Sequence, residues 1–82
     1  MNYAIEFKPK SIKDLKKIPQ LEVDKIFIKI EQMKLDLHGD VKKLTNFTPE
    51  YRLRVGNYRI LFEVENRTIV IYRIISRKDA YS

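Results

Sequence analysis

Hydrophobic and polar residues alternate at the start of the chain. Tyr3, Ile5 and Phe7 fall on one side of an extended backbone, and Asn2, Ala4 and Glu6 fall on the other side. This period of two predicts a short strand over residues 2–7 with one buried face. The strand is expected to end at Lys8-Pro9-Lys10, because proline lacks the backbone N–H that a neighbouring strand would bind.

Two segments with helical spacing follow this strand. Ser11 is in position to cap the first helix, and Asp14, three residues later, completes a weak capping box, so we expect a helix over residues 12–18. The second helix is expected over residues 21–37, with Gly39 just beyond it in the left-handed conformation. Its apolar stripe has the three-and-four spacing of an amphipathic helix: Val23, Ile26, Phe27, Ile30, Met33 and Leu37.

The last part of the chain contains three runs with strand character. Residues 51–55 and 58–65 alternate, and Gly56-Asn57 between them suits a two-residue type II′ hairpin turn. Asn66-Arg67 marks a second turn. Residues 68–76 are almost wholly apolar, which is typical of a strand covered on both faces.

Together these elements predict one α+β domain over residues 1–82. It has an N-terminal strand, an antiparallel two-helix hairpin and a three-stranded antiparallel meander, with the helices packed on one face of the sheet. The length of 82 residues and the hydrophobic fraction of 44% suit a single small core.

The composition excludes several kinds of functional site. The chain has no cysteine and one histidine, which excludes disulfides, thiolate zinc sites and cysteine nucleophiles and leaves no pair of imidazoles. We therefore expect neither a metal nor a cofactor. No apolar run approaches the roughly 20 residues that cross a bilayer, and the N-terminus is charged where a signal peptide would be apolar. A cytoplasmic protein is expected.

The positive charge is unevenly distributed. The net charge is +6, which suits a polyanionic partner. Residues 1–50 contain ten lysines and no arginine, whereas all six arginines lie in residues 51–82. Because arginine matches phosphate geometry better than lysine does, the C-terminal part is the better candidate for a phosphate-binding surface.

The hairpin turn fixes which residues of the two strands face each other. Arg54 is placed directly opposite Arg59, and Arg52 lies opposite Leu61 on the same face. Directly opposed like charges destabilise a sheet by roughly 0.2–1 kcal/mol, so folding alone does not account for them. Either the arginines extend outward on a solvated face, or they converge on an anion. The opposite face pairs six apolar residues that belong to the core: Val55 with Tyr58, Leu53 with Ile60, and Tyr51 with Phe62.

Two segments carry a family resemblance. Tyr51-Arg-Leu-Arg-Val-Gly-Asn-Tyr-Arg-Ile-Leu-Phe-Glu-Val64 and Tyr72-Arg-Ile-Ile-Ser-Arg-Lys-Asp-Ala-Tyr81 resemble the RelE branch of the RelE/ParE toxin superfamily. The similarity in length and element order extends over nearly the whole chain. It implies a toxin of a type II toxin–antitoxin pair that cleaves mRNA in the ribosomal A site without a metal, inhibits translation, and is neutralised by an acidic antitoxin.

The resemblance also assigns catalytic roles. Arg52 and Arg54 match the basic pair that binds the scissile phosphate, and Arg59 matches an arginine that contacts the same phosphate. Arg77 matches the basic residue of the closing motif. Tyr81 matches a tyrosine that stacks on a base and assists proton transfer.

Three further residues are expected to contact RNA, and two positions depart from the family pattern. The expected RNA contacts are Arg73, Ser76 and Lys78. Well-studied ribosome-dependent members carry lysine at one or both positions of Arg52 and Arg54, and many relatives have histidine in place of Ser76. Because arginine does not deprotonate in proteins, Tyr81 is the best remaining candidate for a general base, and slow cleavage of free RNA is expected.

Two other functions stay open at this point. One is a non-enzymatic ParE-like poison that binds DNA gyrase. The other is a decayed toxin that retains only antitoxin or RNA binding.

Overall fold

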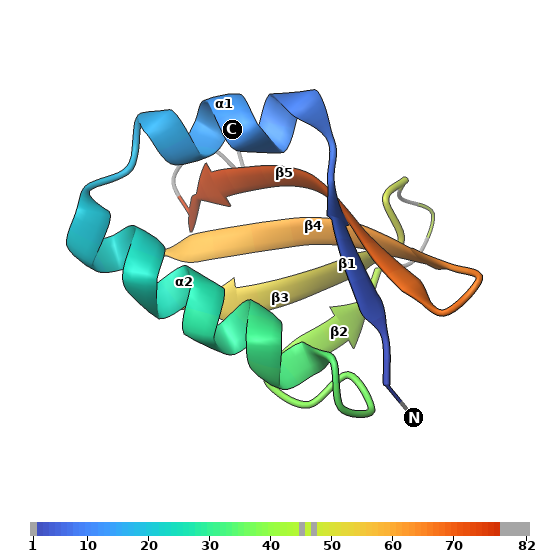
Figure 1. Ribbon diagram of the computed structural model, residues 1–82. Coiled ribbons are helices and arrows are strands. Elements are labelled where there is room, and N and C mark those ends of the chain that lie inside the picture. The colour runs from blue at the N-terminus through green and yellow to red at the C-terminus, as the bar shows by residue number, and fades with distance from the viewer. Residues whose placement is uncertain (1, 45, 47, 78–82) are drawn as a thin grey trace.

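The computed structural model describes residues 2–44, 46 and 48–77 and arranges them as a five-stranded mixed sheet with two helices on one side (Figure 1). The sheet order is β1-β5-β4-β3-β2, with β1 parallel to β5 and the other neighbours antiparallel. The predicted α+β fold is therefore confirmed. In chain order the elements are β1 (Ala4–Phe7), α1 (Pro9–Lys16), α2 (Gln20–Met33), β2 (Val41–Lys43), β3 (Tyr51–Val55), β4 (Tyr58–Glu65) and β5 (Thr68–Ser76).

The core lies between α2 and the sheet. Ile26, Ile30 and Met33 of α2 are at most 2% exposed and pack against the inward residues of the central strands. Burying each such side chain contributes about 1.5–3 kcal/mol relative to leaving it in water. The inward strand residues are Leu53, Val55, Ile60, Phe62, Ile69, Ile71 and Ile74. Because side chains alternate along a strand, the face of the sheet away from α2, here named the outer face, carries Arg52, Arg54, Arg59 and Leu61.

The register of the β3–β4 hairpin is as predicted. Val55 pairs with Tyr58 and Arg54 pairs with Arg59, so Gly56-Asn57 forms a two-residue loop. Gly56 has a φ of 56°, the left-handed conformation that a type II′ turn requires at its first central position. The second predicted turn, Asn66-Arg67, is also confirmed, and positive φ values of 49° and 60° at its two residues are those of a type I′ turn.

The first helix starts earlier than predicted. It begins at Pro9, whose fixed φ and missing N–H suit the first helical position, so Pro9 opens a helix as well as ending β1. The predicted Ser11 cap is wrong, because Lys8 is the N-cap residue. Ser11 is fully buried inside the first turn, where its hydroxyl donates to the Lys8 carbonyl at 2.7 Å.

The second helix ends four residues before the predicted boundary. It stops at Met33, and Asp36 and Leu37 then take left-handed φ values of 57° and 56°. Leu37 still packs against the core from this turn, which explains why the apolar spacing continues to that residue. Gly39 has a positive φ of 129°, but it does not terminate the helix.

Three features of the sheet were not predicted: the parallel pairing of β1 with β5, the strand β2, and a shift in the β4–β5 register. The three-residue strand β2 pairs with β3, with Val41 opposite Leu53, but its two lysines gave no apolar alternation. The β4–β5 register shifts after Leu61, which faces Arg73, while Phe62 faces Ile71. Tyr72 is therefore an additional residue, a β-bulge of the kind that redirects side chains near functional sites.

Candidate functional site

Arg54 and Arg59 form the centre of the site. They lie directly opposite each other on β3 and β4, one residue pair from the hairpin turn. Arg54 is exposed, whereas Arg59 is only 5% exposed. Arg59 donates from Nη1 to the Tyr58 carbonyl at 3.2 Å, and its buried Nε has no hydrogen-bond partner among the described residues. We call these two residues the arginine pair.

This arrangement is electrostatically unfavourable for the protein alone. A buried polar group without a partner costs about 1–3 kcal/mol, and more when it is charged. Two like charges directly opposite on a sheet add to that cost. An anion bound at the outer face would offset both costs, so the geometry of the arginine pair favours an anion site over a merely solvated arginine face.

Arg52 lies on the same face but has a carboxylate partner. Its Nη1 is 3.2 Å from Oδ1 of Asp40 and donates to the Asp40 backbone carbonyl at 3.0 Å. The side chain is 18% exposed. The structure therefore brings together two of the three predicted phosphate ligands, Arg54 and Arg59, and directs the third toward the β2 side of the sheet.

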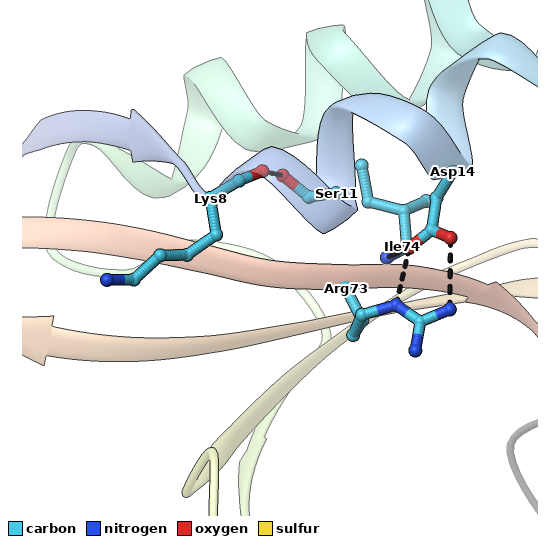
Figure 2. A network of polar contacts seen from close by, with 5 residues as sticks. All are labelled: Lys8, Ser11, Asp14, Arg73 and Ile74. Carbon is cyan, nitrogen blue, oxygen red and sulfur yellow. Dashed lines mark hydrogen bonds and ion pairs between the residues drawn. The ribbon is translucent and has the colours of Figure 1, made fainter.

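Arg73 is held by α1 (Figure 2). Its Nε and Nη2 donate to the two carboxylate oxygens of Asp14 at 2.8 and 3.0 Å, and the Ile74 N–H donates to the same carboxylate at 2.9 Å. Burial alone would raise the pKa of Asp14, but these hydrogen bonds, together with the charges of Arg73 and Lys17, outweigh it and lower that pKa. The hydrogen bond to Asp14 in turn raises the pKa of Arg73. Two of the three guanidinium nitrogens that were expected to meet RNA are thus engaged within the fold.

The end of β5 brings Arg77 to the hairpin. The Arg77 N–H donates to the Asn57 carbonyl at 2.5 Å, and the residue is exposed. Ser76, just before it, is half-buried and lies opposite Tyr58. Arg77 thus joins the end of the sheet where the arginine pair lies. The predicted site residues Lys78 and Tyr81 lie outside the described residues.

Sequence reasoning missed Asp14 and Asp40, the two carboxylates that hold arginines. Asp14 and Arg73 are 59 residues apart, and no local pattern connects them. A signal was nevertheless present, because Arg73 is the one charged residue in the apolar run 68–76, and a charge in such a run requires a partner.

The described residues offer neither a metal site nor a membrane-spanning helix. Within residues 2–44, 46 and 48–77, no group of three or more histidine, cysteine or acidic side chains is arranged to hold a metal ion. Neither described helix is long and apolar enough to cross a membrane.

The chemistry available on the outer face is charge stabilisation. Guanidinium groups donate bidentate hydrogen bonds to phosphate and keep their protons. Arg54 and Arg59 can therefore bind an anion and neutralise charge that develops on it, while proton transfer requires another group.

The chain is similar to known toxins of type II toxin–antitoxin systems. The family described as "ParE toxin of type II toxin-antitoxin system, parDE" matches residues 5–81. Toxin RelE3 of Methanocaldococcus jannaschii is 40% identical over 75 residues, which cover 85% of both chains.

Solved structures agree with this match. A chain of the RelB-RelE antitoxin-toxin complex from Methanococcus jannaschii is similar with a TM-score of 0.78 and 38% identity, covering 93% of this chain and 94% of that one. A chain of the archaeal RelE-RelB complex from Pyrococcus horikoshii OT3 has a TM-score of 0.77 at 22% identity, with 94% and 97% covered, and supports the fold alone. The chain therefore belongs to the RelE/ParE superfamily of type II toxin–antitoxin toxins and is RelE-like.

Proposed function

We propose that this toxin is a metal-independent endoribonuclease that cleaves mRNA on the ribosome and so inhibits translation. The observation that carries the proposal is the arginine pair, in which Arg54 and Arg59 face each other on adjacent strands. A folded protein gains nothing from that arrangement unless an anion binds there. An RNA phosphate supplies the anion.

The proposed reaction is attack of a ribose 2′-hydroxyl on the adjacent phosphate, with departure of the 5′-oxygen of the next nucleotide. Exposed Arg54 makes the first contact with the phosphate. Arg59, on the neighbouring strand, is only 5% exposed, and a buried charge acts more strongly than one in water. Both stabilise the negative charge of the pentacoordinate transition state, the kind of contribution that usually dominates enzymatic rate enhancement.

Proton transfer is assigned to groups outside the arginine pair. Tyr81 is proposed as the general base, with Arg77 as a neighbouring cation that lowers the energy of its phenolate form. Arg52 is proposed to assist phosphate binding after it leaves Asp40, and Ser76 and Lys78 are proposed as RNA contacts. Because this is limited acid–base equipment, the ribosome is proposed to orient the mRNA and supply missing groups.

An acidic antitoxin is the proposed protein partner. Two of the similar solved chains come from complexes of a RelE toxin with a RelB antitoxin. The net charge of +6 makes a negatively charged partner electrostatically favourable. Such a partner can block the arginine pair or alter the position of the catalytic groups.

Expression of the toxin without an antitoxin tests the proposal. The wild-type chain is expected to arrest translation and to leave cut ends on ribosome-bound mRNA, and Arg54→Gln and Arg59→Gln are each expected to abolish both effects. The matched control is Arg67→Asn, which removes one exposed arginine at the far end of β4 and suits the left-handed φ of 60° there. Full cleavage by both site variants would contradict the proposal.

The matched family description favours a second candidate, a ParE-like poison that binds DNA gyrase without cleaving RNA. The 40% identity to a RelE toxin supports the first candidate over this one. The two differ in a measurable way, because a gyrase poison damages DNA and leaves mRNA intact. A decayed toxin would bind its antitoxin and harm neither.

A further inference from the structure

A second cationic site lies on the molecule, separate from the arginine pair. A pocket of about 410 Å³ is lined by six residues from three parts of the chain: Lys8, Pro9, Lys10, Pro49, Tyr72 and Arg73. Two prolines, one tyrosine and three cationic residues thus line the pocket. Apolar walls with a few convergent polar groups are typical of ligand sites.

The two lysines occupy an unfavourable position for the fold. Lys8 is the N-cap of α1 and Lys10 is in its first turn, which contains no acidic residue. The N-terminus of a helix carries partial positive charge, so cations there are destabilising and anions are favoured. Both lysines are exposed, so folding does not explain their placement, whereas an anionic ligand does.

The side chains of the pocket combine an aromatic ring with phosphate-binding cations. Nζ of Lys8 is 5.4 Å from the centre of the Tyr72 ring. Arg73 has Nε and Nη2 engaged by Asp14, and its remaining nitrogen points away from that carboxylate (Figure 2). Lysine and arginine bind the phosphate backbone, and tyrosine stacks on bases.

The pocket is close to the arginine pair along the sheet. Arg59 lies opposite Ile75, and Arg73 is two residues earlier on the same strand, roughly 7 Å away at about 3.3 Å per residue. One strand of RNA can span that separation.

We infer that this pocket binds a nucleotide of single-stranded RNA next to the phosphate held by the arginine pair. The phosphate of that nucleotide contacts Lys8, Lys10 and the free edge of Arg73, and its base packs against Tyr72 and the prolines. The identity of the ligand as RNA rests on the proposed function. The presence of an anion site rests on the pocket itself.

The test is an NMR titration of ¹⁵N-labelled protein with a single-stranded RNA trinucleotide and, separately, with inorganic phosphate. The RNA is expected to shift the amide signals of Lys8, Lys10 and Tyr72. Lys8→Gln/Lys10→Gln is expected to weaken RNA binding at least 5-fold. Lys25→Gln/Lys29→Gln, which removes the same charge from exposed positions of α2, is expected to bind as the wild type does.

A third variant separates base packing from charge. Tyr72→Leu is expected to weaken binding of the trinucleotide and leave phosphate binding unchanged. Unshifted pocket amides, or equal RNA affinity in the two lysine variants, would overturn the inference.

Cleavage of ribosome-bound mRNA distinguishes this inference from the proposed function. Binding of the trinucleotide in the pocket without cleavage of mRNA would support this inference and contradict the proposed function. Cleavage of mRNA without RNA binding in the pocket would support the proposed function and contradict this inference. If the enzyme is active, the Lys8→Gln/Lys10→Gln variant also distinguishes two sources of the RNA. An altered preference for the nucleotide beside the cut identifies mRNA as the ligand. An equal loss of cleavage at all codons identifies ribosomal RNA.

Discussion

The carboxylate of Asp14 in α1 binds the guanidinium of Arg73 in β5 through two hydrogen bonds, at 2.8 and 3.0 Å, and also accepts the N–H of Ile74. The strand β1 runs parallel to β5 and pairs with it from Thr68 only as far as Ile71. Beyond that residue no described strand lies beside this edge of β5, and Asp14 takes the place of one. The contact therefore joins α1 to the part of the β5 edge that no described strand pairs with.

Replacing Asp14 is expected to destabilise the fold. Asp14→Ala removes the partner of Arg73 and leaves the Ile74 N–H without an acceptor, at a cost of about 2 kcal/mol. Asp24→Ala is the control, because Asp24 is exposed and accepts one hydrogen bond, from Gln20 within the same helix. Urea unfolding of both variants measures the difference, and equal midpoints would contradict the structural role of Asp14.

The same contact predicts a pH dependence. The pKa of Asp14 is lower in the folded protein than in the unfolded chain, so its contribution to stability is complete above the unfolded value. That contribution disappears as the pH falls below about 4 and through the folded value. The free energy of unfolding of the wild type should therefore fall more steeply in acid than that of Asp14→Asn. Parallel curves would show that Asp14 does not titrate as inferred.

Replacing Arg59 is expected to separate stability from activity. Arg59→Met removes a buried charge whose Nε has no partner among the described residues, so the free energy of unfolding should stay unchanged or rise by about 1 kcal/mol. Cleavage should fall by about 100-fold or more, as when a transition-state donor is lost. Arg54→Met is the comparison, with little change in stability because Arg54 is exposed. A large loss of stability in Arg59→Met would make Arg59 a structural residue.

Asp40 is expected to restrain Arg52. Asp40→Asn removes the negative charge 3.2 Å from the guanidinium and should free Arg52 for an RNA phosphate. RNA affinity is expected to rise by about 2- to 5-fold, because an exposed ion pair of this kind contributes up to about 1 kcal/mol. Glu65→Gln, an exposed change of equal charge on β4, is the control. The same gain in both variants would mean that only net charge matters.

The two glycines should differ in tolerance to substitution. At Gly56 the φ is 56° and an added Cβ meets no described atom within 4 Å, so Gly56→Ala should cost about 1 kcal/mol. At Gly39 the φ is 129° and an added Cβ would lie 3.2 Å from Cδ1 of buried Leu53, so Gly39→Ala should cost about 2 kcal/mol or more. Thermal unfolding of the two variants gives the order, and the reverse order would contradict this account.

The parts of the fold that local rules determine were predictable. A two-residue loop at Gly56-Asn57 leaves one possible register for its flanking strands, and that register alone places Arg54 opposite Arg59. Helix boundaries were less predictable, because Pro9 opens a helix as readily as it ends a strand. Leu37 contributes to the core from a turn and thus imitates a helical position.

The site was only partly predictable, because its long-range partners leave no local pattern. The sequence predicts phosphate binding by Arg52 and an RNA contact by Arg73, yet each has a carboxylate from another segment beside it. The depth of Arg59 was also hidden, since alternation assigns a face of the sheet but not the degree of burial. The β-bulge at Tyr72, and with it the pocket, depends on strand pairing that sequence alone does not determine.

The parallel pairing of β1 with β5 also has a consequence for biosynthesis. Ala4–Phe7 can pair only after Thr68–Ile71 has been made. The sheet therefore cannot be completed until nearly the whole chain has been translated. Contacts of such long sequence separation form slowly. A newly made molecule thus passes through a period in which its sheet lacks the strand β1.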